Sequence, residues 1–202
     1  MQREDIRIRS TGGGEFDCYL VKPQGSGKVP AIVLASAIHG VDEDLRAITD
    51  EFASHGYIAA APDLFSRTIP GPLGRDDTRT KERSQPRLQR IKEGEADMTD
   101  TLAEIRKLPQ FNGRAAAMGF CYGGPYAILG PKRLGYEAGV SCHGTQLIDL
   151  IIDLDAVTQP GQLERLLARY PYAIPVSAHT GAGVDRLTAA FLEQRIDTRE
   201  AA

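Results

Sequence analysis

Residues 115–129 read Ala-Ala-Ala-Met-Gly-Phe-Cys-Tyr-Gly-Gly-Pro-Tyr-Ala-Ile-Leu, an apolar run, a glycine-rich turn and a second apolar run. The first run predicts a buried strand, and the second, which begins at Pro125, predicts a helix. Between them, Gly119 and Gly123 stand two residues from Cys121 on either side. Such spacing is typical of a nucleophile elbow, a sharp strand-to-helix turn that leaves no room for side chains beside the nucleophile. The alternative is a small, inert cysteine next to an ordinary glycine-rich turn.

Further strands are predicted on both sides of this turn. Ile6–Ser10 alternates apolar and polar residues, and together with Phe16–Val21 it predicts a hairpin across a run of three glycines. Ala31–Ala35 is apolar throughout, which is typical of a parallel strand covered on both faces. Buried strands are also predicted at Tyr57–Ala61 and Tyr136–Ser141.

Helices and loops are predicted between these strands. Asp42 is placed to cap a helix whose apolar residues recur at helical spacing and which ends at Gly56. A second helix is predicted over residues 88–108, and Asn112-Gly113 predicts a turn after it. Residues 66–86 are rich in proline, glycine and charge, which predicts a long surface loop.

The alternation of strands and helices predicts an α/β fold, a three-layer sandwich around a mostly parallel sheet. The length of 202 residues suits a single domain. Ligands of such sheets bind at the carboxyl ends of the strands. His39, Cys121 and His143 each follow a predicted strand at that end, so we expect them around one site.

Composition narrows the classes of function. The net charge of -3 gives no basis for binding nucleic acid, and no stretch reaches the ~20 apolar residues needed to span a membrane. Three widely spaced cysteines and a charged N-terminal segment predict a reduced, cytoplasmic protein. The sequence has no Cys-x-x-Cys pair and no metal-type histidine cluster, so neither a metal nor a cofactor is expected.

Several motifs together resemble the dienelactone hydrolase family of α/β-hydrolases. They occur in the family's order, up to about residue 146, at Gly40-Val41, His55-Gly56-Tyr57, Ala61–Arg67, Asn112-Gly113 and Gly119–Gly124. The resemblance implies a Cys-His-Asp hydrolase that opens esters or lactones, with Cys121 as the nucleophile. It also implies an oxyanion hole formed by the backbone N–H groups of Ile38 and Tyr122.

Two departures from the family pattern concern the partners of Cys121. The family's usual glutamate after the third strand falls on Ala37, and the last third lacks the family's spacing of Asp and His. The positional candidates for catalysis are therefore His179 and Asp185 in the last predicted strand and loop, and His143 beside the turn. The alternatives are a helix-start role for Asp185 and hydrogen-bonded, non-catalytic histidines.

The resemblance also implies a place for substrate binding. The family anchors a substrate carboxylate in the loop region that here carries Arg79, Lys81 and Arg83. These three are the candidate substrate-binding residues. The alternative is a run of solvated surface charges.

The C-terminal part resembles a different family. Residues 153–194 are similar to the end of a translation-factor-class GTPase, through Pro175–Ala178 (Pro-Val-Ser-Ala) and Thr180–Gly183 (Thr-Gly-Ala-Gly). The phosphate-binding Gly-x-x-x-x-Gly-Lys-Ser/Thr and the base-binding Asn-Lys-x-Asp do not occur in the sequence, so GTP binding is not expected. The two resemblances predict a chimera, natural or engineered, in which residues 147–202 complete the sheet of residues 1–146. Pro175 predicts that the added strand lies at the sheet edge.

Two hypotheses follow for the function. In the first, the protein is a thiol hydrolase of small esters or lactones, weakened because the segment that carries the triad His and Asp is replaced. In the second, it is a folded chimeric scaffold without native activity. The sequence favours the first for ancestry and the second for activity. Loss of the family's last strand would expose apolar surface, which favours a homodimer.

Overall fold

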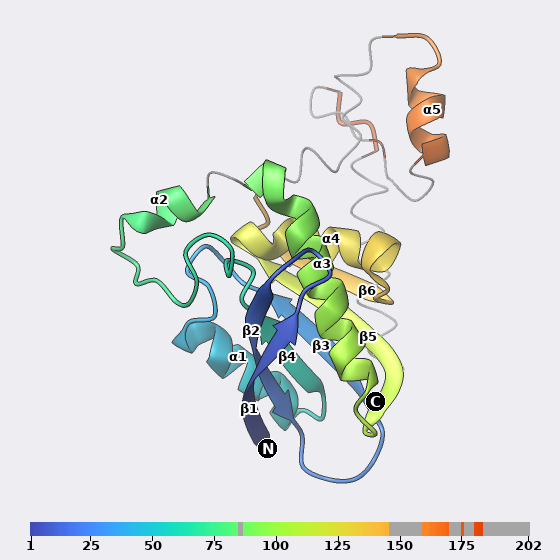
Figure 1. Cartoon of the computed structure of the whole chain (residues 1–202). Helices are drawn as coiled ribbons and strands as arrows, with labels where there is room; N and C mark the ends of the chain where they lie inside the picture. Colours follow the sequence, from blue (N-terminus) through green and yellow to red (C-terminus); the bar gives the residue numbers. More distant parts are fainter. Residues whose placement is uncertain (85–86, 146–158, 170–174, 176–179, 184–202) are drawn as a thin grey trace. The chain divides into compact units, whose positions relative to one another are not determined.

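The computed structural model describes residues 1–84, 87–145, 159–169, 175 and 180–183 (Figure 1). The chain divides into two compact units, Met1–Thr145 and Gln146–Ala202, and each is described by itself. That both units build one domain stays a prediction.

A six-stranded sheet forms the centre of the first unit, in the order β1-β2-β4-β3-β5-β6. Its strands are β1 (Gln2–Arg9), β2 (Glu15–Lys22), β3 (Val29–Ala35), β4 (Ile58–Pro62), β5 (Phe111–Phe120) and β6 (Ala138–Cys142). The pairs β1–β2 and β2–β4 are antiparallel, whereas β4–β3, β3–β5 and β5–β6 are parallel. The predicted N-terminal hairpin is confirmed, and it extends a parallel sheet at one edge.

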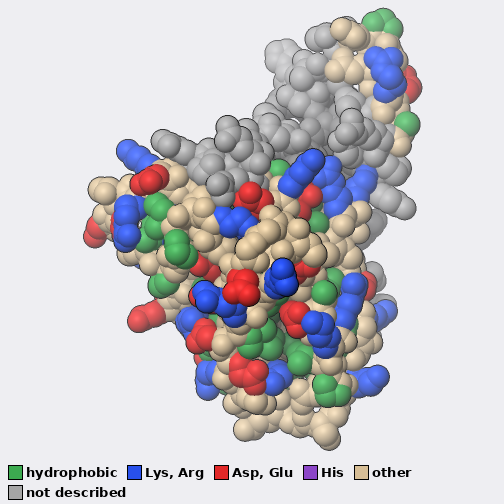
Figure 2. Space-filling view, viewed as in Figure 1, with side chains coloured by type: hydrophobic (Ala, Val, Ile, Leu, Met, Phe, Trp, Pro, Cys, Tyr) green, Lys and Arg blue, Asp and Glu red, His purple; other side chains and the backbone are tan. Residues whose placement is uncertain are grey.

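Helices cover both faces of this sheet. They are α1 (Glu43–Ser54), α2 (Arg79–Ser84), α3 (Arg87–Arg106) and α4 (Gly124–Leu129), with a 3-10 turn Cys121–Gly123 before α4 and a π-helical turn Gly130–Leu134 after it. Helix α1 contacts β2, β3 and β4 on one face, and α3 and α4 contact the sheet and each other on the opposite face (Figure 1). On the face drawn in Figure 2, cationic and anionic side chains are interspersed over this unit.

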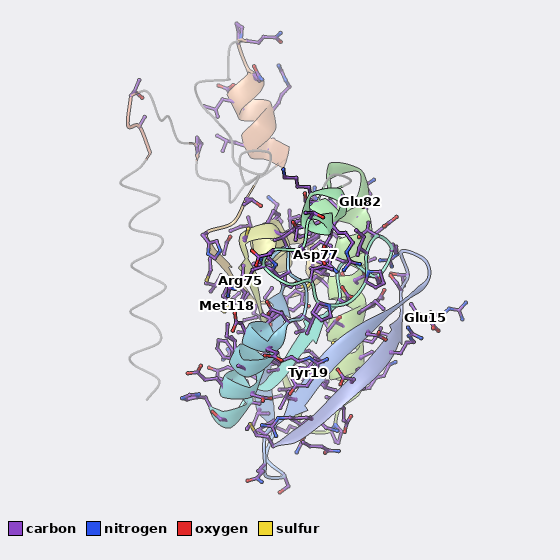
Figure 3. The ribbon with its side chains drawn as sticks, turned by 90° about the vertical axis from the view of Figure 1, so that its left-hand side faces the viewer. Glu15, Tyr19, Arg75, Asp77, Glu82 and Met118 are labelled. Carbon is purple, nitrogen blue, oxygen red and sulfur yellow. The ribbon has the colours of Figure 1, made fainter. Side chains whose placement is uncertain are left out.

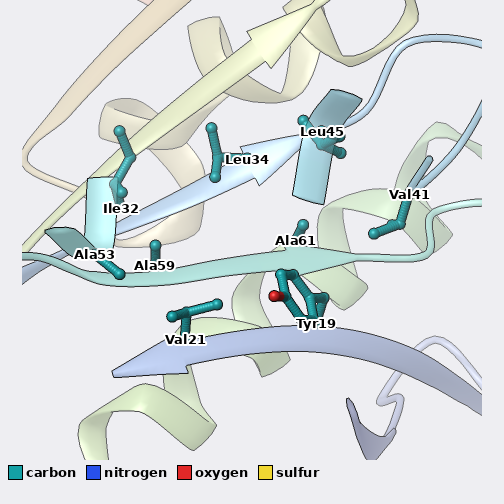
Figure 4. Packing of buried hydrophobic residues seen from close by; sticks show 9 residues of the cluster. All are labelled: Tyr19, Val21, Ile32, Leu34, Val41, Leu45, Ala53, Ala59 and Ala61. Atoms are coloured by element: carbon teal, nitrogen blue, oxygen red, sulfur yellow. The ribbon is translucent and has the colours of Figure 1, made fainter. Parts of the chain in front are cut away.

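The core under α1 follows from the alternation of side chains along the strands. Tyr19 and Val21 of β2 point to the same face as every second residue of β3 and β4 (Figure 4). Leu45 and Ala53 of α1 close over them, and both are buried. The intervening strand residues, such as Leu20 and Val33, are buried on the opposite face, where α3 packs. This double coverage explains the unbroken apolar runs of β3 and β4.

Local signals set the ends of α1. The carboxylate of Asp42 accepts a hydrogen bond from the Leu45 N–H at 2.9 Å, as the sequence predicts for an N-cap. Gly56 follows the helix with φ of +89°, a conformation that favours glycine. The helix thus begins and ends where its capping residues predict.

Two predictions about the segments around α3 are wrong. Residues 66–86 are not loop throughout, because α2 forms at Arg79–Ser84. Asn112-Gly113 is not a turn but lies inside β5, where the pairing with β3 shifts register between Val29 and Ala31. Gly113 adopts φ of +94° there, so the glycine serves an irregularity within a strand.

The second unit contains α5 (Gln162–Arg169), which begins with an N–H bond from Gln162 to the Gln159 carbonyl at 3.1 Å. The predicted C-terminal strand, which ends with Pro175–Ala178, lies outside the described residues apart from Pro175 itself, and so does the helix start predicted at Asp185. The predicted placement of this strand at a sheet edge stays a prediction.

Candidate active site

A cavity of about 330 Å³ opens at the carboxyl ends of the parallel strands. Its walls come from the loop after β3, the start of α1, the loop before α2 and the ends of β5 and β6. The lining residues are Ala37, Ile38, His39, Gly40, Asp42, Asp44, Leu45, Ile48, Arg75, Phe120, Cys121 and His143. The cavity therefore lies where an α/β sheet binds its ligands, and it brings together His39, Cys121 and His143.

Cys121 lines this cavity from a strained turn. Its φ of +47° lies in the left-handed region, which costs a non-glycine residue of the order of 1–3 kcal/mol. A Cβ at Gly119 would stand 2.2 Å from the Gly123 carbonyl oxygen, and a Cβ at Gly123 would stand 2.1 Å from that of Ala35. Both positions require glycine because the turn is pressed against its own strand and against β3.

His143 shares the strained geometry of Cys121. Phe120, the last residue of β5, pairs with Cys142, the last residue of β6. Cys121 and His143 therefore directly follow the ends of two neighbouring parallel strands. Among the described residues, they are the two non-glycine residues with positive φ, and that of His143 is +43°. The Thr145 N–H then donates to the Cys121 carbonyl at 2.9 Å and ties the two strand ends together.

His39 is held by the loop before α2. Its Nδ1 lies 3.2 Å from the Leu73 carbonyl oxygen, which can only accept, so Nδ1 carries the proton of this bond. The Leu73 N–H donates in turn to the His39 carbonyl at 2.9 Å. In the neutral ring this arrangement leaves Nε2 as the basic nitrogen.

The carboxylates at the cavity have other partners. Asp42 caps α1, and Asp44 accepts a hydrogen bond from Arg75 at 2.7 Å. Ala37, where the resemblance places the family's glutamate, lines the cavity. Among the described lining residues, none between Ala37 and Gly40 carries a carboxylate.

The three candidate substrate-binding residues all belong to α2, yet none of them is among the lining residues of the cavity. Arg79 pairs with Asp77 at 2.6 Å, and its hydrogen bonds lower the pKa of Asp77 to about 2. Lys81 is exposed. Arg83 is fully buried, so the alternative of a solvated charge run is wrong for this residue. The cation that lines the cavity is Arg75, which the sequence did not single out.

Arg83 binds backbone rather than solvent. Its guanidinium donates to the carbonyl of Ile38 at 3.1 Å and also to the carbonyls of Ile69 and Gly71. Burial lowers its pKa below the ordinary value of an arginine. The sequence around Arg83 is charged, as in a surface helix, and no local pattern in it predicts a buried arginine that binds backbone carbonyls.

The remaining candidates are His179 and Asp185, and the remaining histidine is His55. The Nδ1 of His55 lies 2.8 Å from the Glu51 carbonyl oxygen at the end of α1, away from the cavity lining. His179 and Asp185 lie outside the described residues. Within the described part of the chain, no three His, Cys, Asp or Glu side chains gather to hold a metal ion, and no helix there could cross a bilayer.

The sheet and its helices have the architecture of the α/β-hydrolase fold. One solved structure with this fold is m3DLH, which is 21% identical, with a TM-score of 0.64 over 90% of this chain and 89% of that chain. A second is the dienelactone hydrolase-like promiscuous phosphotriesterase P91 from metagenomic libraries, 14% identical, with a TM-score of 0.61 over 88% of this chain and 83% of that chain. At these identities the likeness concerns the fold alone.

The chain belongs to the dienelactone hydrolase family, whose model matches residues 16–164. It is 29% identical to a putative carboxymethylenebutenolidase of Azospirillum brasilense, over 90% of this chain and 85% of the relative. It is also 29% identical to carboxymethylenebutenolidase 1 of Cupriavidus pinatubonensis, over 79% of this chain and 69% of the relative. The family match runs past residue 146, where the resemblance was expected to end.

Proposed function

We propose that the protein hydrolyses small esters or lactones, with the Cys121 sulfur as nucleophile. One observation carries the proposal: Cys121 has φ of +47° at the wall of the cavity, in a turn that only Gly119 and Gly123 fit. Backbone strain of this kind persists at functional sites because the surrounding structure holds it. Membership in the family and the names of the two relatives agree with hydrolysis of this class.

The turn would act as a nucleophile elbow. The Cys121 thiolate attacks the carbonyl carbon of the substrate, and the C=O electron pair moves to the oxygen. The backbone N–H groups of Ile38 and Tyr122 donate to this oxyanion. When the tetrahedral intermediate collapses, the alcohol leaves with a proton from an imidazole, and a thioester remains on Cys121. Water then attacks the thioester carbon while the imidazole takes a proton from it. The C–S bond breaks, which releases the carboxylic acid and restores the Cys121 thiolate.

We assign the imidazole to His143, since it lines the cavity with Cys121 and follows the neighbouring strand. His39 lines the same cavity, and because its Nδ1 is held by the Leu73 carbonyl, its Nε2 makes it a second candidate. His179, with Asp185 to orient it, is the competing assignment. Substitution of each histidine by glutamine separates the three: loss of the base removes the dependence of kcat/KM on an imidazole pKa, and it costs about 10²–10⁴-fold in rate.

The test of the nucleophile is hydrolysis of a p-nitrophenyl ester and of a γ-lactone by the wild type and by Cys121→Ser. We expect Cys121→Ser to lose at least about 10²-fold in kcat/KM. Cys142→Ser is the matched control, because Cys142 is another partly buried cysteine, one strand away and outside the cavity lining. Its rate should stay within about threefold of the wild type.

The competing hypothesis is the chimeric scaffold without native activity, and it predicts a different result. Equal rates near background for the wild type and Cys121→Ser would support it and would end the proposal of a hydrolase. The GTPase-like C-terminal segment, the homodimer and the impaired triad stay predictions.

A further inference from the structure

We infer that Arg83 is a positioning residue that holds the oxyanion loop, residues 36–40, in place against the Cys121 turn. This inference rests on the proposed function, because it assigns Ile38 and Tyr122 to the oxyanion hole. It departs from the expectation that Arg83 anchors a substrate carboxylate.

The first support is the set of groups to which Arg83 donates. Its Nη1 binds the Ile38 carbonyl, and its Nη2 binds the carbonyls of Ile69 and Gly71. One planar guanidinium thus joins the oxyanion loop to the loop before α2, with the side chain fully buried. The Ile38 carbonyl lies in the peptide plane that it shares with the His39 N–H. The Ile38 N–H belongs to the plane before it, so Arg83 restrains this N–H indirectly, through the Cα of Ile38.

The second support is a stack of side chains that leads from Arg83 to the other proposed amide. The Arg83 guanidinium carbon lies 4.3 Å from the centre of the Phe65 ring. The Phe65 ring lies 4.6 Å from that of Tyr122, the residue directly after Cys121. Arg83 therefore contacts Ile38 directly and supports Tyr122 through one aromatic ring.

The third support is the space left around the guanidinium. A Cβ at Gly40 would meet Arg83 Nη1 at 2.9 Å and the Gly71 carbonyl oxygen at 2.9 Å, and Gly40 has φ of +79°. Asp63 holds the other side of Gly71 by accepting its N–H at 2.7 Å. The oxyanion loop is therefore packed directly onto Arg83 and its carbonyl partners. Figure 3 labels Arg75 and Asp77 in the loop before α2, and Glu82 within α2, directly before Arg83 in the sequence.

The test compares Arg83→Met with Arg106→Met. Arg106 is the matched control, since it is an exposed arginine that donates to a single backbone carbonyl, that of Gly135, and lies outside the cavity lining. Two rates are measured for each variant: kcat for a p-nitrophenyl ester, which needs the oxyanion hole, and alkylation of Cys121 by iodoacetamide, which does not.

We expect Arg83→Met to lose about 10–10²-fold in kcat, with the alkylation rate within about twofold of the wild type and little change in KM. Arg106→Met should keep both rates. A kcat of Arg83→Met within about twofold of Arg106→Met would overturn the inference, as would a parallel loss of ester hydrolysis and alkylation.

Amide hydrogen exchange gives a readout that does not depend on activity. The Gly40 N–H donates to the Ala37 carbonyl, and the Leu73 N–H donates to that of His39. These two amides should exchange at least about tenfold faster in Arg83→Met, while the amides of β4 stay unchanged. Equal acceleration everywhere, or none at Gly40 and Leu73, would refute the inference.

Arg83→Lys covers the case in which Arg83→Met does not fold, because lysine keeps the charge but offers no planar fork. It should show a smaller loss of kcat and the same selective exchange at Gly40 and Leu73; wild-type values for both would refute the inference. A wild type that is inactive refutes the proposed function instead, and the exchange experiment still decides whether Arg83 holds the loop.

Discussion

Gly123→Ala should destabilise the protein by about 2–3 kcal/mol, and the contacts of the Cys121 turn explain the size. The added Cβ would stand 2.1 Å from the Ala35 carbonyl oxygen and 2.5 Å from its carbonyl carbon, where ordinary contacts are 3.4–4 Å. Neither partner is a flexible side chain: Ala35 pairs with Gly119 in the parallel ladder between β3 and β5. The backbone must therefore shift by about 1 Å or more, at the upper end of the 1–3 kcal/mol usual for overpacking.

A smaller, opposite effect acts on the unfolded chain. Alanine restricts the unfolded backbone more than glycine does, which favours the folded state by about 0.4–1 kcal/mol. Gly27→Ala is the matched control, because no atom lies within 4 Å of its added Cβ and its φ is not positive. This variant should be unchanged or slightly more stable than the wild type.

Thermal unfolding followed by circular dichroism measures both effects. For a chain of this length, about 2–3 kcal/mol lowers Tm by roughly 4–12 °C. We expect a loss of that size for Gly123→Ala, with a drop in ester hydrolysis at temperatures where it is folded. A Tm within about 2 °C of the wild type would show that the turn yields easily, and would refute the reasoning that it requires glycine.

Two further predictions concern buried carboxylates. Asp97 is fully buried and accepts two hydrogen bonds from Arg67, of 2.6 and 2.8 Å, so Asp97→Ala should lower the free energy of unfolding in urea by about 3 kcal/mol. The control Asp17→Ala removes an exposed partner of Arg7 and should lower it by less than about 1 kcal/mol. Equal losses for the two variants would contradict this reasoning. Burial raises the pKa of Asp63 above its ordinary value of 3.8, against the opposing N–H bonds from Gly71 and Phe65. Asp63 therefore binds a proton more readily in the folded state than in the unfolded state. As the pH falls from about 7 to about 4.5, the wild type should gain stability relative to Asp63→Asn. A difference between the two unfolding free energies that does not change with pH would contradict the raised pKa.

Local patterns were enough to predict most of the first unit. The apolar runs at β3 and β4, the alternation in β1 and the capping of α1 by Asp42 each depend on neighbouring residues. The turn at Cys121 could be predicted for the same reason. Gly119 and Gly123 are needed because a Cβ at either position would collide with the turn itself or with the adjacent strand.

The role of Arg83 could not be predicted because its partners are far away in the sequence. Ile38, Ile69 and Gly71 reach it only once the loops after β3 and β4 have folded together. Helix α2 is short and carries four charged residues, so its local pattern resembles that of a surface loop. The turn predicted at Asn112-Gly113 was wrong for a related reason. This pair favours turns, but here it lies inside β5, where the pairing with β3 changes register.

The edge of the sheet at β1 bears on how the protein behaves at high concentration. Within the described residues, β1 pairs with β2 alone, so its outer backbone groups are open to another strand. Five of its eight residues are charged, and most of the strand is exposed. Docking a second chain along this edge would strip water from those charges, which opposes strand-to-strand aggregation. The protein should therefore resist fibril-like association through this edge even though the backbone there is unpaired.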